Sequence, residues 1–185
     1  MTRDGAHAKL AYDWYGSWTT LYSLYPAALL CFQAPAANAP ANFTPFLPPQ
    51  LFVNQSLHYA NVMQRYGLPL DSRHLYTKSD WAFQAAAVAS PAVQDTIILA
   101  TARWLNETST NKPFTDLYDT EGTGGFAEGT EFKARPVVGS HFAYLTLQQA
   151  CGGKGTAIPR YFGAEANEAQ NSEIIAWWRS YLAGL

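Results

Sequence analysis

The sequence has little charge and no long apolar run. Charged residues make up 14% of its 185 residues, and twelve Lys and Arg against fourteen Asp and Glu give a net charge of −2. A surface that binds nucleic acid needs concentrated positive charge, so this composition excludes nucleic acid as a partner. No apolar run reaches the roughly 18 residues of a membrane-spanning helix, so we expect no membrane partner.

Cysteines and familiar catalytic motifs are scarce too. Cys31 and Cys151 are too few to define a disulfide framework, and whether they pair is left open by the sequence. The HExxH, CxxC, GxSxG and Walker motifs are absent, and no Lys-Ser or Lys-Thr follows the glycine-rich GTGGF stretch. No spacing of His, Asp or Cys calls for a metal ion, so the sequence predicts neither a metal nor another cofactor.

Aromatic residues, by contrast, are abundant. They form 15% of the chain, with six Trp, eleven Tyr and ten Phe, and 48% of all residues are hydrophobic. A chain of this length fits one domain with a substantial core. The aromatic content favours a thick core or a ring-lined cleft that holds sugars or small polar ligands.

Three N-x-S/T sequons favour a secreted or extracellular glycoprotein. They begin at Asn42, Asn54 and Asn106. The N-terminal residues MTRDGAHAKLAYDW contain no apolar targeting segment, so a secreted protein would carry this chain as part of a longer one.

Helical spacing dominates the hydrophobic pattern. It predicts helices over residues 16–32 (kinked or divided at Pro26), 51–66, 80–89, 91–106, 136–149 and 171–182. Gly67 is expected to stop the second helix, and Ser79 or Asp80 to cap the third. Residues 33–50 form a proline-rich connector, and residues 111–134 a loop. The predicted fold is mainly α: a single domain over residues 1–185 built from antiparallel helix pairs with long loops.

Polar groups concentrate at the predicted junctions of loops and helices. As acids or bases we select Asp71, Asp80 and Asp116, because carboxylates in different environments can exchange roles in proton transfer. Arg73 and Arg135 are candidates to bind a substrate carboxylate, and Trp14 and Trp81 to line the pocket; these seven are the predicted site residues.

Each choice has a purely structural alternative. Asp80 could cap its helix, Asp71 and Arg73 could pair to stabilise a loop, and Asp116 could make a turn. His141, which follows Arg135 closely and has aromatic neighbours, fits a packing role better than a catalytic one.

Several of these blocks resemble a known family. YDWYGSWTTLYSLYPAALL, YGLPLDSRHLYTKSDW, AAAVASP, RWLNETSTNKPFTDLYDTEG and FKARPVVGSHFAYL are similar to the C-terminal α-helical region of the fungal glutaminase A family, in order and spacing, from about residue 11 to about residue 150. The sequence departs from the pattern at Ala82, where relatives often have an acid, and at Ser140, where they tend to have glycine.

The resemblance implies an α-helical toroid like the (α/α) barrels of many glycoside hydrolases, with β-rich domains that lie outside this chain. It implies secretion and hydrolysis of L-glutamine to L-glutamate and ammonia. Three hypotheses follow: a glutaminase-like amidohydrolase acting on glutamine, a carbohydrate-active toroid with two carboxylates across a cleft, and a non-catalytic part of a larger enzyme whose partners are its missing domains.

Overall fold

The computed structural model describes residues 1–33, 42–127, 129–153 and 162. Within them it contains α1 (Leu24–Leu29), α2 (Pro49–Val62), α3 (Ser79–Ala86), α4 (Pro91–Glu107), the 3-10 helix η1 (Pro136–Phe142), α5 (Ala143–Gly153) and the strands β1 (Tyr76–Lys78) and β2 (Leu117–Asp119). The domain is therefore mainly helical, as predicted. The expected helix over 171–182 and residues 34–41 of the connector lie outside the described residues, and the connector ends in the first two residues of α2.

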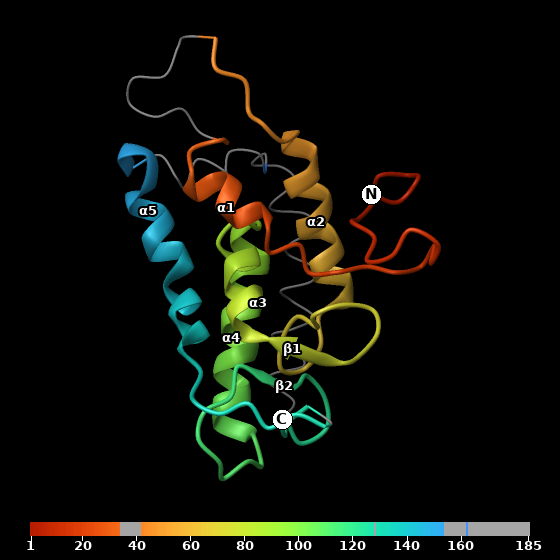
Figure 1. Ribbon diagram of the computed structural model, residues 1–185, viewed down its shortest axis with the longest axis vertical. Coiled ribbons are helices and arrows are strands. Elements are labelled where there is room, and N and C mark those ends of the chain that lie inside the picture. The colour runs from red at the N-terminus through yellow and green to blue at the C-terminus, as the bar shows by residue number, and fades with distance from the viewer. Residues whose placement is uncertain (34–41, 128, 154–161, 163–185) are drawn as a thin grey trace.

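Helix α3 occupies the centre of the fold. It contacts η1, α4, α5 and α1, and in Figure 1 it lies with α4 between α2 and α5. Its small residues Ala82, Ala85 and Ala86 are buried against Tyr59 and Ile97, which belong to α2 and α4. Alanine adds little bulk at these contacts, so neighbouring helices approach closely, which explains why so bland a sequence occupies the middle of the core.

Helix α4 follows its sequence signals. The Ser90 side chain accepts a hydrogen bond from the backbone N–H of Val93, and Pro91 takes the first helical position, where its missing N–H costs nothing. The predicted helix over 91–106 is therefore confirmed, and it ends at Glu107.

The predicted helix over 16–32 is wrong for its first half. Only Leu24–Leu29 are helical, and Pro26 lies in the first turn of α1, so it causes no kink. Upstream, the Thr20 N–H donates to the carbonyl of Leu70 at 2.9 Å, and its hydroxyl donates to the carbonyl of Pro69 at 2.8 Å. These bonds to a distant loop hold the segment extended and outweigh its helical periodicity.

Other boundaries differ for local reasons. Helix α2 starts at Pro49 and stops at Val62, because Met63 is extended; Gly67 belongs to a separate turn with Gln64. Helix α3 starts at Ser79, its N-cap position is Lys78, and neither Ser79 nor Asp80 caps it. The predicted helix over 136–149 divides into η1 and α5.

A two-stranded antiparallel sheet was not predicted. Strand β2 lies inside the region expected to be a loop, and it pairs with β1 in the register Tyr76↔Asp119, Thr77↔Tyr118 and Lys78↔Leu117. Each strand has only three residues, too short for a clear alternation of apolar and polar side chains. This sheet brings Ser79, the first residue of α3, beside Asp116, the residue that precedes β2.

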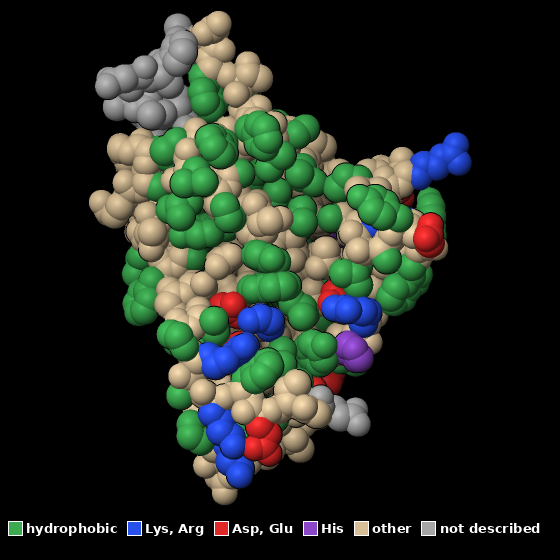
Figure 2. Space-filling view, viewed as in Figure 1, with side chains coloured by type: hydrophobic (Ala, Val, Ile, Leu, Met, Phe, Trp, Pro, Cys, Tyr) green, Lys and Arg blue, Asp and Glu red, His purple; other side chains and the backbone are tan. Residues whose placement is uncertain are grey.

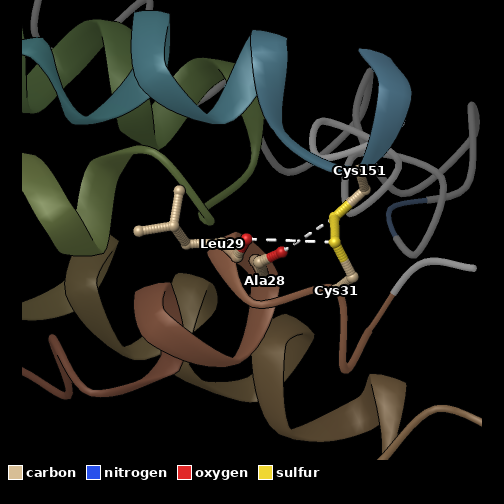
Figure 3. The surroundings of a disulfide bond; sticks show 4 residues. All are labelled: Ala28, Leu29, Cys31 and Cys151. Atoms are coloured by element: carbon tan, nitrogen blue, oxygen red, sulfur yellow. Dashed lines mark hydrogen bonds between the residues drawn. A yellow bond between two sulfur atoms is a disulfide. The ribbon is translucent and has the colours of Figure 1, made fainter. Parts of the chain in front are cut away.

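Cys31 and Cys151 form a disulfide, which settles the question left open by the sequence. The two Cα atoms are 5.5 Å apart, and the bond joins the chain just after α1 to the end of α5 (Figure 3). The Cys151 sulfur lies 3.6 Å from the carbonyl oxygen of Ala28. The bond thus fastens two helices that already share a buried core around Leu24, Phe52 and Leu147.

No helix in the described part of the chain is both long and apolar enough to span a membrane.

Candidate functional site

A cluster of four charged side chains lies where the small sheet meets α3. It comprises Lys78, Asp80, Asp116 and Arg135, and we call it the charged cluster. Lys78 ends β1 and pairs in register with Leu117, the residue after Asp116. The backbone N–H of Ser79 also donates to the carbonyl of Asp116 at 2.8 Å. Strand pairing therefore joins two segments that are distant in sequence.

Asp116 is the most enclosed member of the charged cluster. Its side chain is fully buried. Arg135 donates from Nε to Oδ1 at 2.8 Å and from Nη2 to Oδ2, while Lys78 Nζ lies 3.5 Å from Oδ2. Burial by itself raises the pKa of Asp116, but the Arg135 hydrogen bonds and the two positive charges outweigh it and hold the pKa below its usual value. Asp116 is therefore a carboxylate at neutral pH, and it holds the two cations in place.

Asp80 is bound less completely. Lys78 Nζ donates to its Oδ2 at 3.2 Å and lies 3.1 Å from Oδ1. Oδ1 is itself buried, and no hydrogen bond to it is found within the described residues. Most buried polar atoms in folded proteins are hydrogen-bonded, and one that is not costs about 1–3 kcal/mol. The contact that stabilises this oxygen is its 3.1 Å ion pair with Lys78, whose geometry is not that of a hydrogen bond.

Aromatic rings support both cations. Lys78 Nζ lies 5.3 Å from the centre of the Trp81 ring, which in turn stacks on Tyr22 with ring centres 3.9 Å apart. The Arg135 guanidinium lies 3.8 Å from the centre of the Phe132 ring. Such contacts restrict the cations without neutralising them.

His141 borders the charged cluster. Its Nε2 lies 2.9 Å from the hydroxyl oxygen of Ser79, and its ring packs 4.5 Å from that of Phe83. Burial lowers the pKa of His141, and the nearby carboxylates of Asp80 and Asp116 only partly oppose this. The histidine is therefore neutral near pH 7, and it ties η1 to the start of α3.

In the charged cluster the more exposed side chains are positively charged and the buried ones are negatively charged. The side chains of Arg135 and Lys78 are 31% and 16% exposed, whereas those of Asp80 and Asp116 are 7% and 0% exposed. Figure 2 shows blue and red side chains close together near the middle of one face, among hydrophobic ones. A molecule that reaches this surface therefore meets the cations first.

Asp71 and Arg73 lie in the preceding loop and bind each other. Arg73 donates from Nε to Oδ1 at 2.9 Å and from Nη2 to Oδ2 at 2.7 Å, and its backbone N–H also bonds Oδ1. Burial alone raises the pKa of Asp71, yet these bonds bring it below its usual value. These contacts agree with the structural alternative, in which Asp71 and Arg73 pair to stabilise the loop. In the part of the chain that the structure describes, no hydrogen bond or ion pair joins it to the charged cluster.

Trp14, the remaining predicted site residue, is 46% exposed in the N-terminal segment. Its carbonyl accepts a hydrogen bond from Ser17, and no described contact connects its ring to the charged cluster. Four of the seven predicted residues thus come together: Asp80, Asp116, Arg135 and Trp81.

Lys78, Ser79, His141 and Tyr22 were not selected from the sequence. Lys78 stands among the polar residues before α3, which was the one available signal. The others are placed by contacts between distant segments. Among the described residues, no group of three or more His, Cys, Asp or Glu side chains could hold a metal ion.

Fold and cluster together define a mainly helical domain with a polar site at a loop–helix junction. Residues 1–145 match the model of the glutaminase A six helical-hairpin domain, and the chain belongs to this family. It is 55% identical over 172 residues to a probable glutaminase of Arthroderma benhamiae, covering 84% of this chain and 20% of that protein. It is 50% identical over 101 residues to glutaminase A of Aspergillus oryzae, covering 55% of this chain and 14% of that protein.

The chain thus spans a fifth or less of the length of these two relatives. No solved structure showed significant similarity to it.

Proposed function

We propose that this chain is the helical part of a glutaminase-like amidohydrolase that converts L-glutamine to L-glutamate and ammonia. The names of both relatives support this reaction, as does membership of the family. The observation that carries the proposal to particular residues is the buried Asp80 carboxylate inside the charged cluster, whose Oδ1 makes an ion pair with Lys78 but no hydrogen bond.

Asp80 is the proposed general base. Its Oδ1 would accept a proton from a water molecule, whose oxygen attacks the side-chain amide carbon of glutamine. The carbon–nitrogen bond then breaks as the nitrogen takes this proton from Asp80 and leaves as ammonia. Asp116 is less suited to accept that proton, because both of its oxygens accept hydrogen bonds from Arg135, whereas no arginine bonds Asp80 within the described residues. Its proposed role is to position these two cations.

Arg135 is the proposed clamp for the substrate carboxylate, and Trp81 the proposed wall beside it. Asp71 and Arg73 already satisfy each other, and Trp14 has no described contact with the charged cluster, so the mechanism does not use them.

The setting of the site is also part of the proposal. We propose that the helices belong to an (α/α) toroid completed by further segments of a longer polypeptide, which would be the partners of this chain. We further propose that the protein is secreted. The disulfide supports this, because such bonds persist in oxidising compartments and are rare in the cytosol.

The test is ammonia release from L-glutamine by the purified 185-residue chain and its Asp80→Asn variant. Loss of a general base lowers the rate by about a hundredfold or more. Asp95→Asn is the matched control, because Asp95 is an exposed acid of α4 remote in sequence from the charged cluster. Circular dichroism and urea unfolding verify that each variant is folded.

A fully active, folded Asp80→Asn variant would exclude Asp80 as the base. A folded parent chain that releases no ammonia would contradict activity of this chain alone and support the non-catalytic hypothesis. Oligosaccharides serve as a second set of substrates, since their cleavage would instead favour the carbohydrate-active hypothesis.

A further inference from the structure

Two of the three sequons lie on helices, and the structure places their asparagines in different surroundings. Asn54 belongs to α2 and Asn106 to α4. An N-linked glycan is bulky and strongly hydrated, so the asparagine that carries it has to lie at the surface of the folded protein. The groups around each side-chain amide therefore decide which sequon is compatible with a glycan.

The side-chain amide of Asn54 already makes native contacts. Its Nδ2 donates to the carbonyl oxygen of Gly5 at 2.7 Å, and its Oδ1 accepts a hydrogen bond from Nε2 of Gln50 at 2.6 Å. The N-terminal segment lies directly against this amide, since a Cβ at Gly5 would come within 3.9 Å of Nδ2. A sugar on Nδ2 would displace that segment from α2.

The rest of the Asn54 sequon belongs to the core. Both Gln55 and Ser56 are buried. The Ser56 hydroxyl donates to Oγ of Ser90 at 3.1 Å and accepts a hydrogen bond from the Ser90 backbone N–H at 3.0 Å. Ser90 is the N-cap of α4. This sequon is therefore part of the packing that joins α2 to the start of α4 and to the N-terminal segment.

Asn106 has the opposite setting. It is exposed, and it shares one face of α4 with Asp95, Leu99 and Ala102, which are exposed as well. The helix ends directly after Asn106, at Glu107, and the backbone leaves the helical conformation at Thr108. The amide of Asn106 therefore points away from the core, at the outer end of the helix, where a large substituent has room.

We infer that Asn106 carries an N-linked oligosaccharide and that Asn54 stays unmodified in the folded chain. The inference rests on the proposed secretion of the protein, because this modification takes place in the secretory pathway. The oligosaccharide is added to the extended chain before folding, so burial selects among the products. A chain modified at Asn106 folds normally, whereas one modified at Asn54 cannot pack its N-terminal segment against α2.

The modification is a group transfer from a lipid pyrophosphate that carries the oligosaccharide. The side-chain amide nitrogen of Asn106 forms a bond to the anomeric carbon of the first sugar, and one of its two protons passes to the transferase. The bond from that carbon to the pyrophosphate oxygen breaks, and the lipid pyrophosphate leaves with the bonding electrons. The product is a secondary amide that joins the sugar to the end of α4.

Peptide mapping tests the inference directly. The 185-residue chain is produced with a cleavable secretion signal in a eukaryotic host, and it is collected from both the medium and the cells. A peptide N-glycosidase acting in heavy-oxygen water converts each glycosylated asparagine to a labelled aspartate, which mass spectrometry locates. We expect the label at position 106 and an unlabelled asparagine at position 54.

Variants identify the acceptor independently. Asn106→Gln removes the acceptor nitrogen of this sequon, so the intact mass should fall by one whole oligosaccharide. Asn111→Gln is the matched control, because Asn111 is an exposed asparagine outside any sequon and its replacement should leave the oligosaccharide in place. Asn54→Gln should also leave the mass of attached oligosaccharide unchanged.

The absence of label at Asn106 in a folded chain whose Cys31–Cys151 bond has formed would overturn the inference, as would label at Asn54. If Asn106 is labelled but the chain stays inside the cells, the inference stands and the proposed secretion fails. If the labelled chain releases no ammonia from L-glutamine, the inference stands and the proposed reaction fails for this chain. Ammonia release by a chain unlabelled at Asn106 gives the reverse result.

Discussion

Replacing Cys31 and Cys151 by serine removes the covalent bond that joins the chain after α1 to the end of α5. The two residues are separated by 120 positions in sequence. In the chain-entropy description, a bond across a loop of this length restricts the unfolded chain by about 5 kcal/mol at 25 °C. Because whole domains are stable by only about 5–15 kcal/mol, the serine pair should lose much of its stability.

Backbone conformation refines this expectation. Cys31 and Cys151 have φ values of 64° and 57°, in the left-handed region that residues other than glycine rarely adopt. Serine keeps that conformational cost, whereas glycine removes it. We therefore expect the Cys31→Gly/Cys151→Gly pair to be about 1–2 kcal/mol more stable than the serine pair, although both lack the disulfide.

Urea unfolding followed by circular dichroism measures both effects from the midpoint and the slope of the transition. The slope should rise when the bond is lost, because a chain without the cross-link exposes more surface on unfolding. A serine pair destabilised by less than about 1 kcal/mol would refute the argument from loop length. A glycine pair no more stable than the serine pair would refute the argument from backbone conformation.

Two further predictions concern single residues. Gly124 has φ +62°, and a Cβ there would lie 2.7 Å from Cδ1 of Trp104, whereas Gly122 has φ +61° with nothing within 4 Å of its Cβ position. Gly124→Ala should therefore unfold at a clearly lower urea concentration than Gly122→Ala. Equal midpoints would show that the Trp104 side chain moves aside without loss of stability. Burial and the neighbouring His7 lower the pKa of His58 to about 4, so the unfolded chain takes up this proton first as pH falls, and stability should decrease between pH 6.5 and about 4. His58→Asn should reduce this dependence, as measured by urea unfolding across that range, and an unchanged slope of stability against pH in His58→Asn would contradict it.

The sequence predicted the helices whose signals are local. Helix α4 has its cap at Ser90, its proline at the first position and a continuous apolar stripe, all within one window. The segment over 16–23 has a similar stripe, yet its backbone bonds to residues near Leu70. A pattern read along one segment contains no information about such a partner, so this error could not be avoided from the sequence alone.

The charged cluster was partly foreseen. Asp80, Asp116 and Arg135 were selected because each is a polar group beside aromatic residues at a predicted loop–helix junction. The register of β1 and β2 decides which of these groups meet, and strands of three residues leave too weak a pattern to reveal it. Asp71 satisfied the same criteria, but its neighbour Arg73 binds it locally. Only coordinates separate a local pair from a cluster between distant segments.

The β1–β2 pair has a consequence for how the family can vary in length. Lys78 and Leu117 are partners across the sheet, so the chain leaves and returns at the same place, with α3, α4 and their connections between. Insertions or deletions in the mostly exposed turn over residues 110–113, after α4, would therefore change the surface of the domain without moving Lys78 away from Asp116. That turn is where natural variants, or a grafted reporter peptide, should be accepted with the charged cluster intact.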